Sequence, residues 1–107
     1  MFDLNELCVM AYENASKREA KEGKVSTDTM QMLKHTATEV VEATEAYYDF
    51  FYSDSDWDDR KCVFASELAD IVCCVLIIAG KENIDMEKAL TGCMEKNYYR
   101  AIGKGDK

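Results

Sequence analysis

The sequence predicts an all-α protein built as an antiparallel bundle of about four helices. Three observations support this fold class. The 107-residue chain has no proline and only five glycines, so few residues in it would break a helix. Hydrophobic residues make up 48% of the chain and recur at spacings of three and four, the period of a helix. Valine and isoleucine are most concentrated in one central apolar run. The length fits a single domain over residues 1–107.

The first helix is predicted from an apolar stripe near the N-terminus. The stripe consists of Leu4, Leu7, Cys8, Ala11 and Ala15. It fades into the charged segment that follows, and Gly23 supplies a stop signal, because glycine readily adopts the left-handed conformation that ends helices.

The second helix is predicted from about Asp28 to Tyr52, with Ser26 or Thr27 as its N-cap and Asp28 in its first turn. Its expected core-facing stripe is Met30, Leu33, Ala37, Val40, Val41, Thr44, Tyr47, Tyr48 and Phe51. A different face carries His35, Glu39, Glu42, Ala46 and Asp49. Taken alone, these acids are what any amphipathic helix exposes to solvent.

The third helix is predicted over residues 63–79, VFASELADIVCCVLIIA, and its polar residues are unusual. Only Ser66, Glu67 and Asp70 are polar among its seventeen side chains, so we expect a helix buried almost all round. Two carboxylates buried there cost free energy unless a cation or hydrogen-bond donors neutralise them. Residues 53–59, SDSDWDD, are expected to form a loop in which Trp57 covers the core edge or stacks on an aromatic ligand.

The fourth helix is predicted after a short connection, with Asp85 as its N-cap. Its expected inward-facing residues are Met86, Leu90, Cys93, Met94 and Asn97. Lys96 and Arg100 follow one turn apart near its end. They either complement the negative end of the helix dipole or clamp a phosphate.

Charge and cysteine content narrow the classes of function. The net charge is −8, and the stretch from Glu39 to Asp59 holds eight acids and no lysine or arginine, which argues against nucleic-acid or anionic-membrane binding. Five cysteines without a CxxC pair fit a reduced cytoplasmic setting rather than a disulfide framework or a zinc site. The N-terminus lacks a signal-peptide pattern, and the nine-residue run 71–79 is too short to span a bilayer.

Two acidic pairs share one spacing. Glu39 and Glu42 lie three apart on the second helix, as Glu67 and Asp70 do on the third, so each pair occupies one helix face. A short loop makes these helices antiparallel neighbours. If the pairs face each other, four carboxylates converge, and all-oxygen ligation selects Mg²⁺, Mn²⁺ or Ca²⁺ over zinc or copper.

Two other interpretations of the acids remain open. A di-iron bundle needs Glu-x-x-His on two helices, whereas the sole histidine, His35, precedes Glu39 by four residues. Alternatively, the acids form no site and pair with lysines in a helical interaction module. The predicted core stripes, however, contain no Lys or Arg to satisfy Glu67 or Asp70.

These motifs resemble the MazG-like family of all-α nucleoside triphosphate pyrophosphohydrolases. The family's ExxE and ExxD motifs correspond to Glu39–Glu42 and Glu67–Asp70, and further similarity lies in ELAD, IDMEKAL and MEKNYYRA, so that the resemblance covers roughly Thr38 to Ala101. The chain departs from many members at Thr38 and Val41, where they carry Glu and Gly. The departure affects the assignment to a subgroup rather than the acidic pairs.

The resemblance implies hydrolysis of a nucleoside or deoxynucleoside triphosphate to the monophosphate and pyrophosphate, in nucleotide-pool housekeeping. It implies Mg²⁺, or Mn²⁺, held by Glu39, Glu42, Glu67 and Asp70, with Glu39 or Glu42 as general base. Phosphate contacts would come from Lys96, Asn97 and Arg100, and base or sugar contacts from Trp57 and His35. It also implies a homodimer or homotetramer, which would cover the apolar third helix. The alternatives are a non-catalytic helical module that binds nucleotide or protein, and a plain dimerisation bundle.

Overall fold

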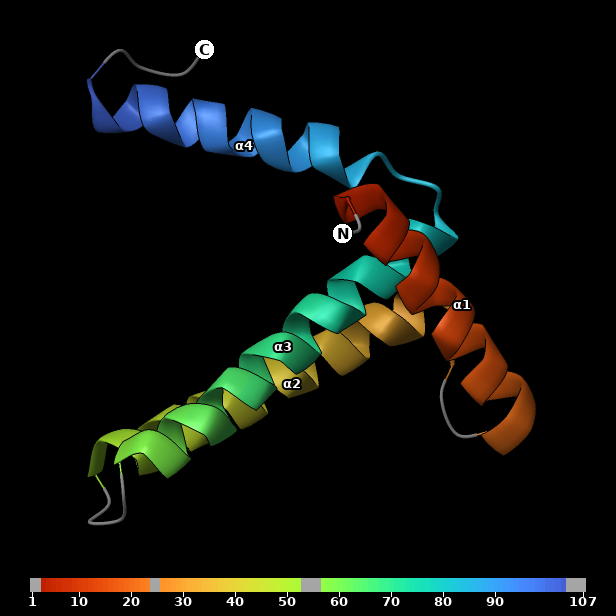
Figure 1. The fold of residues 1–107 in the computed structure, drawn as a ribbon, viewed down its shortest axis with the longest axis horizontal. Coiled ribbons are helices and arrows are strands. Elements are labelled where there is room, and N and C mark those ends of the chain that lie inside the picture. The colour runs from red at the N-terminus through yellow and green to blue at the C-terminus, as the bar shows by residue number, and fades with distance from the viewer. Residues whose placement is uncertain (1–2, 24–25, 53–56, 104–107) are drawn as a thin grey trace.

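Four helices make up the part of the chain that the computed structural model describes, residues 3–23, 26–52 and 57–103. They are α1 (Leu4–Glu22), α2 (Thr29–Tyr52), α3 (Trp57–Lys81) and α4 (Met86–Ala101). No strand occurs in these ranges, so the all-α prediction is confirmed. α3 is the central element, because it packs along α2 as an antiparallel neighbour and is crossed by α1 (Figure 1).

The crossing of α1 over α3 depends on small residues. A Cβ atom on Gly80 would overlap the carbonyl oxygen of Cys8 and lie 2.8 Å from Cβ of Tyr12, so only glycine lets the two helices approach this closely. Around this contact Cys8, Ala15 and Ala79 are each no more than 3% exposed. The α1–α3 contact is therefore built from backbone and short side chains.

The caps of α1 and α2 follow the sequence signals with one correction. Gly23 ends α1 in the left-handed conformation, at φ 67°, as predicted. α2 begins one residue later than expected, and the cap is Asp28, whose carboxylate accepts a hydrogen bond from the Gln31 backbone N–H at 3.1 Å. Thr27 has another role: its N–H and hydroxyl donate to the Glu19 carboxylate at 2.6 and 3.2 Å, which ties the connection to α1.

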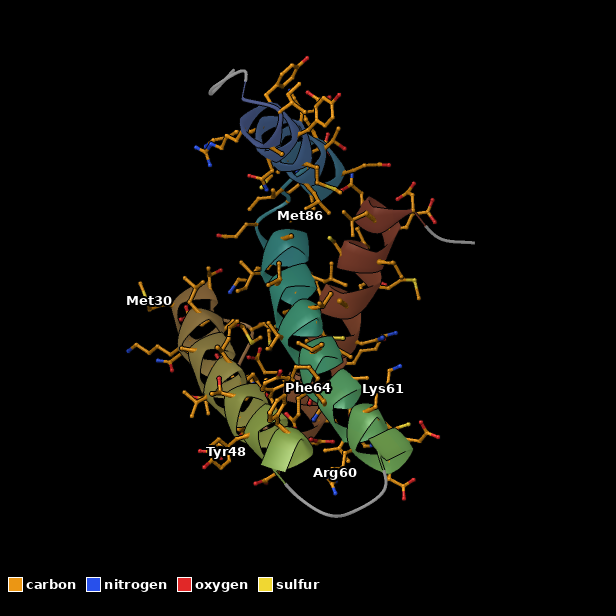
Figure 2. The ribbon with its side chains drawn as sticks, turned by 90° about the vertical axis from the view of Figure 1, so that its left-hand side faces the viewer. Met30, Tyr48, Arg60, Lys61, Phe64 and Met86 are labelled. Atoms are coloured by element: carbon orange, nitrogen blue, oxygen red, sulfur yellow. The ribbon has the colours of Figure 1, made fainter. Side chains whose placement is uncertain are left out.

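α2 faces α3 with a different stripe from the one predicted. Among the side chains of α2 that the structure describes, Met32 and Ala43 are buried, and that of Glu39, on the same face, is only 12% exposed. The predicted stripe was wrong, because its large members are 47% to 63% exposed: Met30, Leu33, Val40, Val41, Tyr47, Tyr48 and Phe51. Figure 2 shows Met30 and Tyr48 on the side of α2 turned away from α3. The α2–α3 contact thus includes short side chains, and Tyr47 of the predicted stripe also reaches α3, with its ring centroid 5.2 Å from that of Phe64. The broader apolar face of α2 remains exposed.

α3 begins earlier and is less covered than the sequence predicted. It starts at Trp57, so the expected loop at residues 57–59 is instead the first turn, where Asp58 and Asp59 complement the positive end of the helix dipole. The prediction of a helix buried all round was also wrong. Its apolar residues that remain 38% to 57% exposed are Val63, Leu68, Val72 and Val75.

The full length of α3 changes the membrane argument. The segment Asp58–Lys81 reaches a mean hydropathy of 2.3 over its most apolar stretch, so by length and composition it is able to cross a bilayer. The nine-residue run 71–79 underestimates the length of the apolar segment in α3. Whether protein or lipid covers α3 therefore depends on its charged side chains.

α4 projects away from the other helices. Asp85 caps it, as predicted, by accepting from the Lys88 N–H at 3.0 Å. However, none of its described residues is buried, and Leu90 and Met94 are 43% and 64% exposed, so the prediction that its apolar stripe faces inward was wrong for the single chain. α4 packs against the beginning of α1 and forms the second arm of a V-shaped chain (Figure 1).

The single chain is extended for its length. Its radius of gyration is 16.7 Å, against about 13 Å for a compact domain of this size. Its accessible surface is 8031 Å² for 12.2 kDa, whereas a compact monomer of that mass would expose about 6,100 Å². The helices form as predicted, and much of their apolar surface is left uncovered by the chain itself.

The tight α1–α3 crossing predicts opposite effects for two glycine substitutions. Gly80→Ala should lower the free energy of unfolding by about 1–3 kcal/mol, because the methyl group forces α1 and α3 apart. Gly92→Ala, in α4 with no atom within 4 Å of the added Cβ, is the matched control and should raise it by about 0.4–1 kcal/mol. Urea unfolding followed by circular dichroism measures both. Equal effects of the two substitutions would contradict the close contact at Gly80.

Candidate metal centre

Three carboxylates converge where α2 packs against α3. Glu39 comes from α2 and Glu67 and Asp70 from α3, and one oxygen of each lies within 4.8 Å of the others. The antiparallel packing brings the two faces opposite each other, so the convergence expected from the sequence is found for three of the four acids. Neither Glu67 nor Asp70 forms an ion pair with a described residue.

Two oxygen atoms of this cluster are buried without a partner. They are Oε2 of Glu39 and Oε2 of Glu67, which accept no hydrogen bond from the described residues. Leaving a buried polar group unpaired costs about 1–3 kcal/mol. Burial, followed by the negative charge of Glu42, raises the pKa of Glu39, while the nearby His35 opposes the rise. Burial and the neighbouring charge therefore both disfavour the ionised form of Glu39.

Glu42 and Asp70 connect the cluster to solvent. Both residues are exposed, so the expectation of two buried acids on α3 holds for the Glu67 oxygen and not for Asp70. Glu42 lies outside the group of three, yet it is close enough to act on the pKa of Glu39. The cluster therefore has a buried floor and an open, acidic rim.

The donor atoms favour a hard cation. All three converging groups are carboxylates, and oxygen donors suit Mg²⁺, Mn²⁺ and Ca²⁺. One thiol beside the cluster, that of Cys74, is buried, and this burial raises its pKa. A protonated thiol is a poor ligand for softer metals such as zinc. The five cysteines are all free.

The other predicted site residues are divided between the cluster and α4. His35 lies at the cluster, with Nε2 3.0 Å from Oε1 of Glu39. Lys96, Asn97 and Arg100 are exposed on α4, the arm that diverges from α2 and α3 (Figure 1), so the single chain does not bring them to the acids. Trp57 is the first residue of α3, and its side chain lies outside the described residues.

The contact between His35 and Glu39 could have been predicted from the sequence. His35 and Glu39 are four residues apart on a helix, a spacing that places side chains in contact. The sequence interpretation assigned His35 to the substrate instead.

Comparisons with known proteins found no protein similar to this chain. No family of known proteins, no curated protein and no solved structure matches this chain. Its function is therefore argued from the geometry and chemistry of the acidic cluster, together with the motif resemblance described above.

The raised pKa of Glu39 predicts how pH acts on the metal-free protein. Because this pKa is higher in the folded chain than its ordinary value of 4.5, folding favours the protonated form. Stability should therefore fall as the pH rises through the folded pKa. Glu39→Gln should remove this loss and raise the thermal stability of the metal-free protein at neutral pH, because glutamine carries no charge to desolvate. Thermal unfolding in a chelator from mildly acidic to neutral pH measures it.

The control is Glu13→Gln, at an exposed position of α1. It should leave the pH dependence of wild-type stability unchanged. Parallel pH curves for wild type and Glu39→Gln would contradict the electrostatic conflict assigned to Glu39.

Proposed function

We propose that this chain is a Mg²⁺-dependent nucleoside triphosphate pyrophosphohydrolase, which cleaves a nucleotide to the monophosphate and pyrophosphate. The observation that carries the proposal is the group of three carboxylates from two helices, within 4.8 Å of one another, in which two buried oxygens have no described partner. A divalent cation satisfies both oxygens and neutralises the repulsion among the acids. The motif resemblance supports the same reaction.

The position of each acidic residue in the cluster suggests its role in the proposed reaction. Glu39, Glu67 and Asp70 would hold Mg²⁺, or Mn²⁺, and the cation supplies Lewis-acid polarisation of the phosphoryl group and neutralisation of phosphate charge. Glu42 stands beside the group of three on its exposed rim. We therefore assign Glu42, rather than Glu39, the role of general base that takes a proton from the attacking water.

We further propose that the protein is a homodimer or homotetramer. The chain exposes about 2,000 Å² more than a compact monomer of its mass, and a standard interface needs about 800 Å² from each partner. Large apolar side chains line the exposed faces of α2, α3 and α4. Since α4 does not reach the acids of its own chain, phosphate contacts by Lys96, Asn97 and Arg100 would be made across such an interface.

A second copy covers α3 better than lipid does. Glu67 and Asp70 lie near the middle of the segment that is long enough to span a membrane, and an acid at the centre of a bilayer costs about 2.5–3.5 kcal/mol even on the most permissive scale. In a protein assembly the same acids remain at a wet, cation-binding edge. We therefore propose that protein, rather than lipid, covers α3, and the free cysteines fit a location in the cytoplasm.

The alternative is a helical module that binds nucleotide or protein without turnover. The breadth of the exposed apolar faces on α2 and α3 also suits this class of protein. It differs from the enzyme in one measurable respect, because it releases no pyrophosphate even when the cluster binds a cation.

The proposed chemistry predicts the loss of activity in two conservative variants. Glu67→Gln and Asp70→Asn should each reduce pyrophosphate release to the level of a protein-free blank, because each removes a charged ligand, while circular dichroism shows an intact fold. The assay uses Mg²⁺ and a panel of ribonucleotides and deoxyribonucleotides, including modified bases. Glu13→Gln should keep full activity. Wild-type protein that releases no pyrophosphate from any nucleotide of the panel would rule out the enzyme in favour of the module.

The proposed assembly predicts that two similar valines respond differently to charge. Val72 on α3 and Val9 on α1 are 54% and 50% exposed, but only Val72 lies on α3, the helix that we propose a second copy covers. Val72→Lys should shift the protein from oligomer to monomer in sedimentation velocity, and Val9→Lys should not. A wild-type monomer at micromolar concentration would overturn the assembly.

A further inference from the structure

A histidine lies against one oxygen of a nearly buried carboxylate at the cluster. The Nε2 atom of His35 lies 3.0 Å from Oε1 of Glu39, a distance that a hydrogen bond spans once the imidazole N–H turns towards that oxygen. The His35 side chain is 56% exposed, whereas that of Glu39 is 12% exposed. The contact joins two residues one turn apart on α2, so the helix itself sets their separation.

The second oxygen of Glu39 is the one that remains available. Oε2 is buried and accepts no hydrogen bond from the described residues, and Glu39 belongs to the group that converges with Glu67 and Asp70. The terminal torsion of a glutamate is soft and has no sharp rotamer. Without a partner on Oε1, the carboxylate would be free to turn and to present either oxygen in several orientations.

We infer that His35 is a positioning residue, which donates from Nε2–H to Oε1 of Glu39 and thereby presents Oε2 to the cation. This inference rests on the proposed metal centre and replaces the expectation that His35 contacts the base or sugar of a substrate. Hydrogen bonds to a ligating carboxylate orient the ligand, and losing such a partner costs about 10–100-fold in metal affinity or activity.

The test measures Mn²⁺ binding to metal-free protein by electron paramagnetic resonance. His35→Ala should weaken the Mn²⁺ affinity about 10–100-fold, and His35→Gln should restore most of it, because the glutamine amide supplies an N–H donor at a similar reach. Lys34→Ala is the matched control: it removes a full positive charge one residue away, from an exposed side chain, and should bind Mn²⁺ as wild type does.

Activity supplies an independent readout. His35→Ala should require about 10–100-fold more Mg²⁺ for half-maximal pyrophosphate release, while kcat at saturating Mg²⁺ stays close to that of wild type. A residue that contacts the nucleotide would instead raise KM for the nucleotide at saturating Mg²⁺.

Each outcome decides the inference. Wild-type affinity in His35→Ala, failure of His35→Gln to restore it, or an equal loss in Lys34→Ala would overturn the positioning role. Wild type that binds Mn²⁺ but turns over no nucleotide would overturn the proposed enzyme and leave the role of His35 to be judged by binding. Wild type that binds no Mn²⁺ would overturn the metal centre and the positioning role together.

Discussion

The structure depends on negative charge held in place by the packing of α2 against α3. Small side chains such as Ala43 and Cys74 bring the two helices together, and that contact forces Glu39 towards Glu67 and Asp70. The packing favours the arrangement, while burial and like-charge repulsion oppose it. The imidazole of His35 lies near only one of the Glu39 oxygens. In the metal centre that we propose, a divalent cation would relieve this conflict.

Local signals predicted the helices well. The Asp85 cap and the Gly23 stop act through hydrogen bonds and backbone conformation within a few residues, and a sequence contains all the information that such signals need. The acidic pair on α3 was equally visible, since charged residues inside an apolar run require a partner. The start of α3 at Trp57 was missed, because a run of aspartates and serines was interpreted as a loop although acids also favour the first turn of a helix.

Long-range packing was predicted less well, for a physical reason. Hydrophobic periodicity identifies the most apolar face of a helix, but it does not say which neighbour covers that face. On α2 the large residues such as Val41 and Tyr48 are exposed, and the short side chain of Ala43 faces α3. Alanine contributes little to a hydrophobic pattern, yet it allows the closest approach of two helices. The same limit applies to α4. Its apolar stripe exists, but contacts with α1, near the other end of the chain, direct α4 away from the other helices.

The direction of α4 depends on one side chain of α1. Asn5 donates to the Asp85 carboxylate at 2.9 Å and accepts from the Glu87 N–H at 3.1 Å. These two hydrogen bonds fix the first turn of α4 against α1. A helix of 16 residues is about 24 Å long. If α4 tilted by about 10° at its contact with Asn5, Arg100 would move by about 4 Å. The position of the basic end of α4 therefore depends in part on Asn5 of α1.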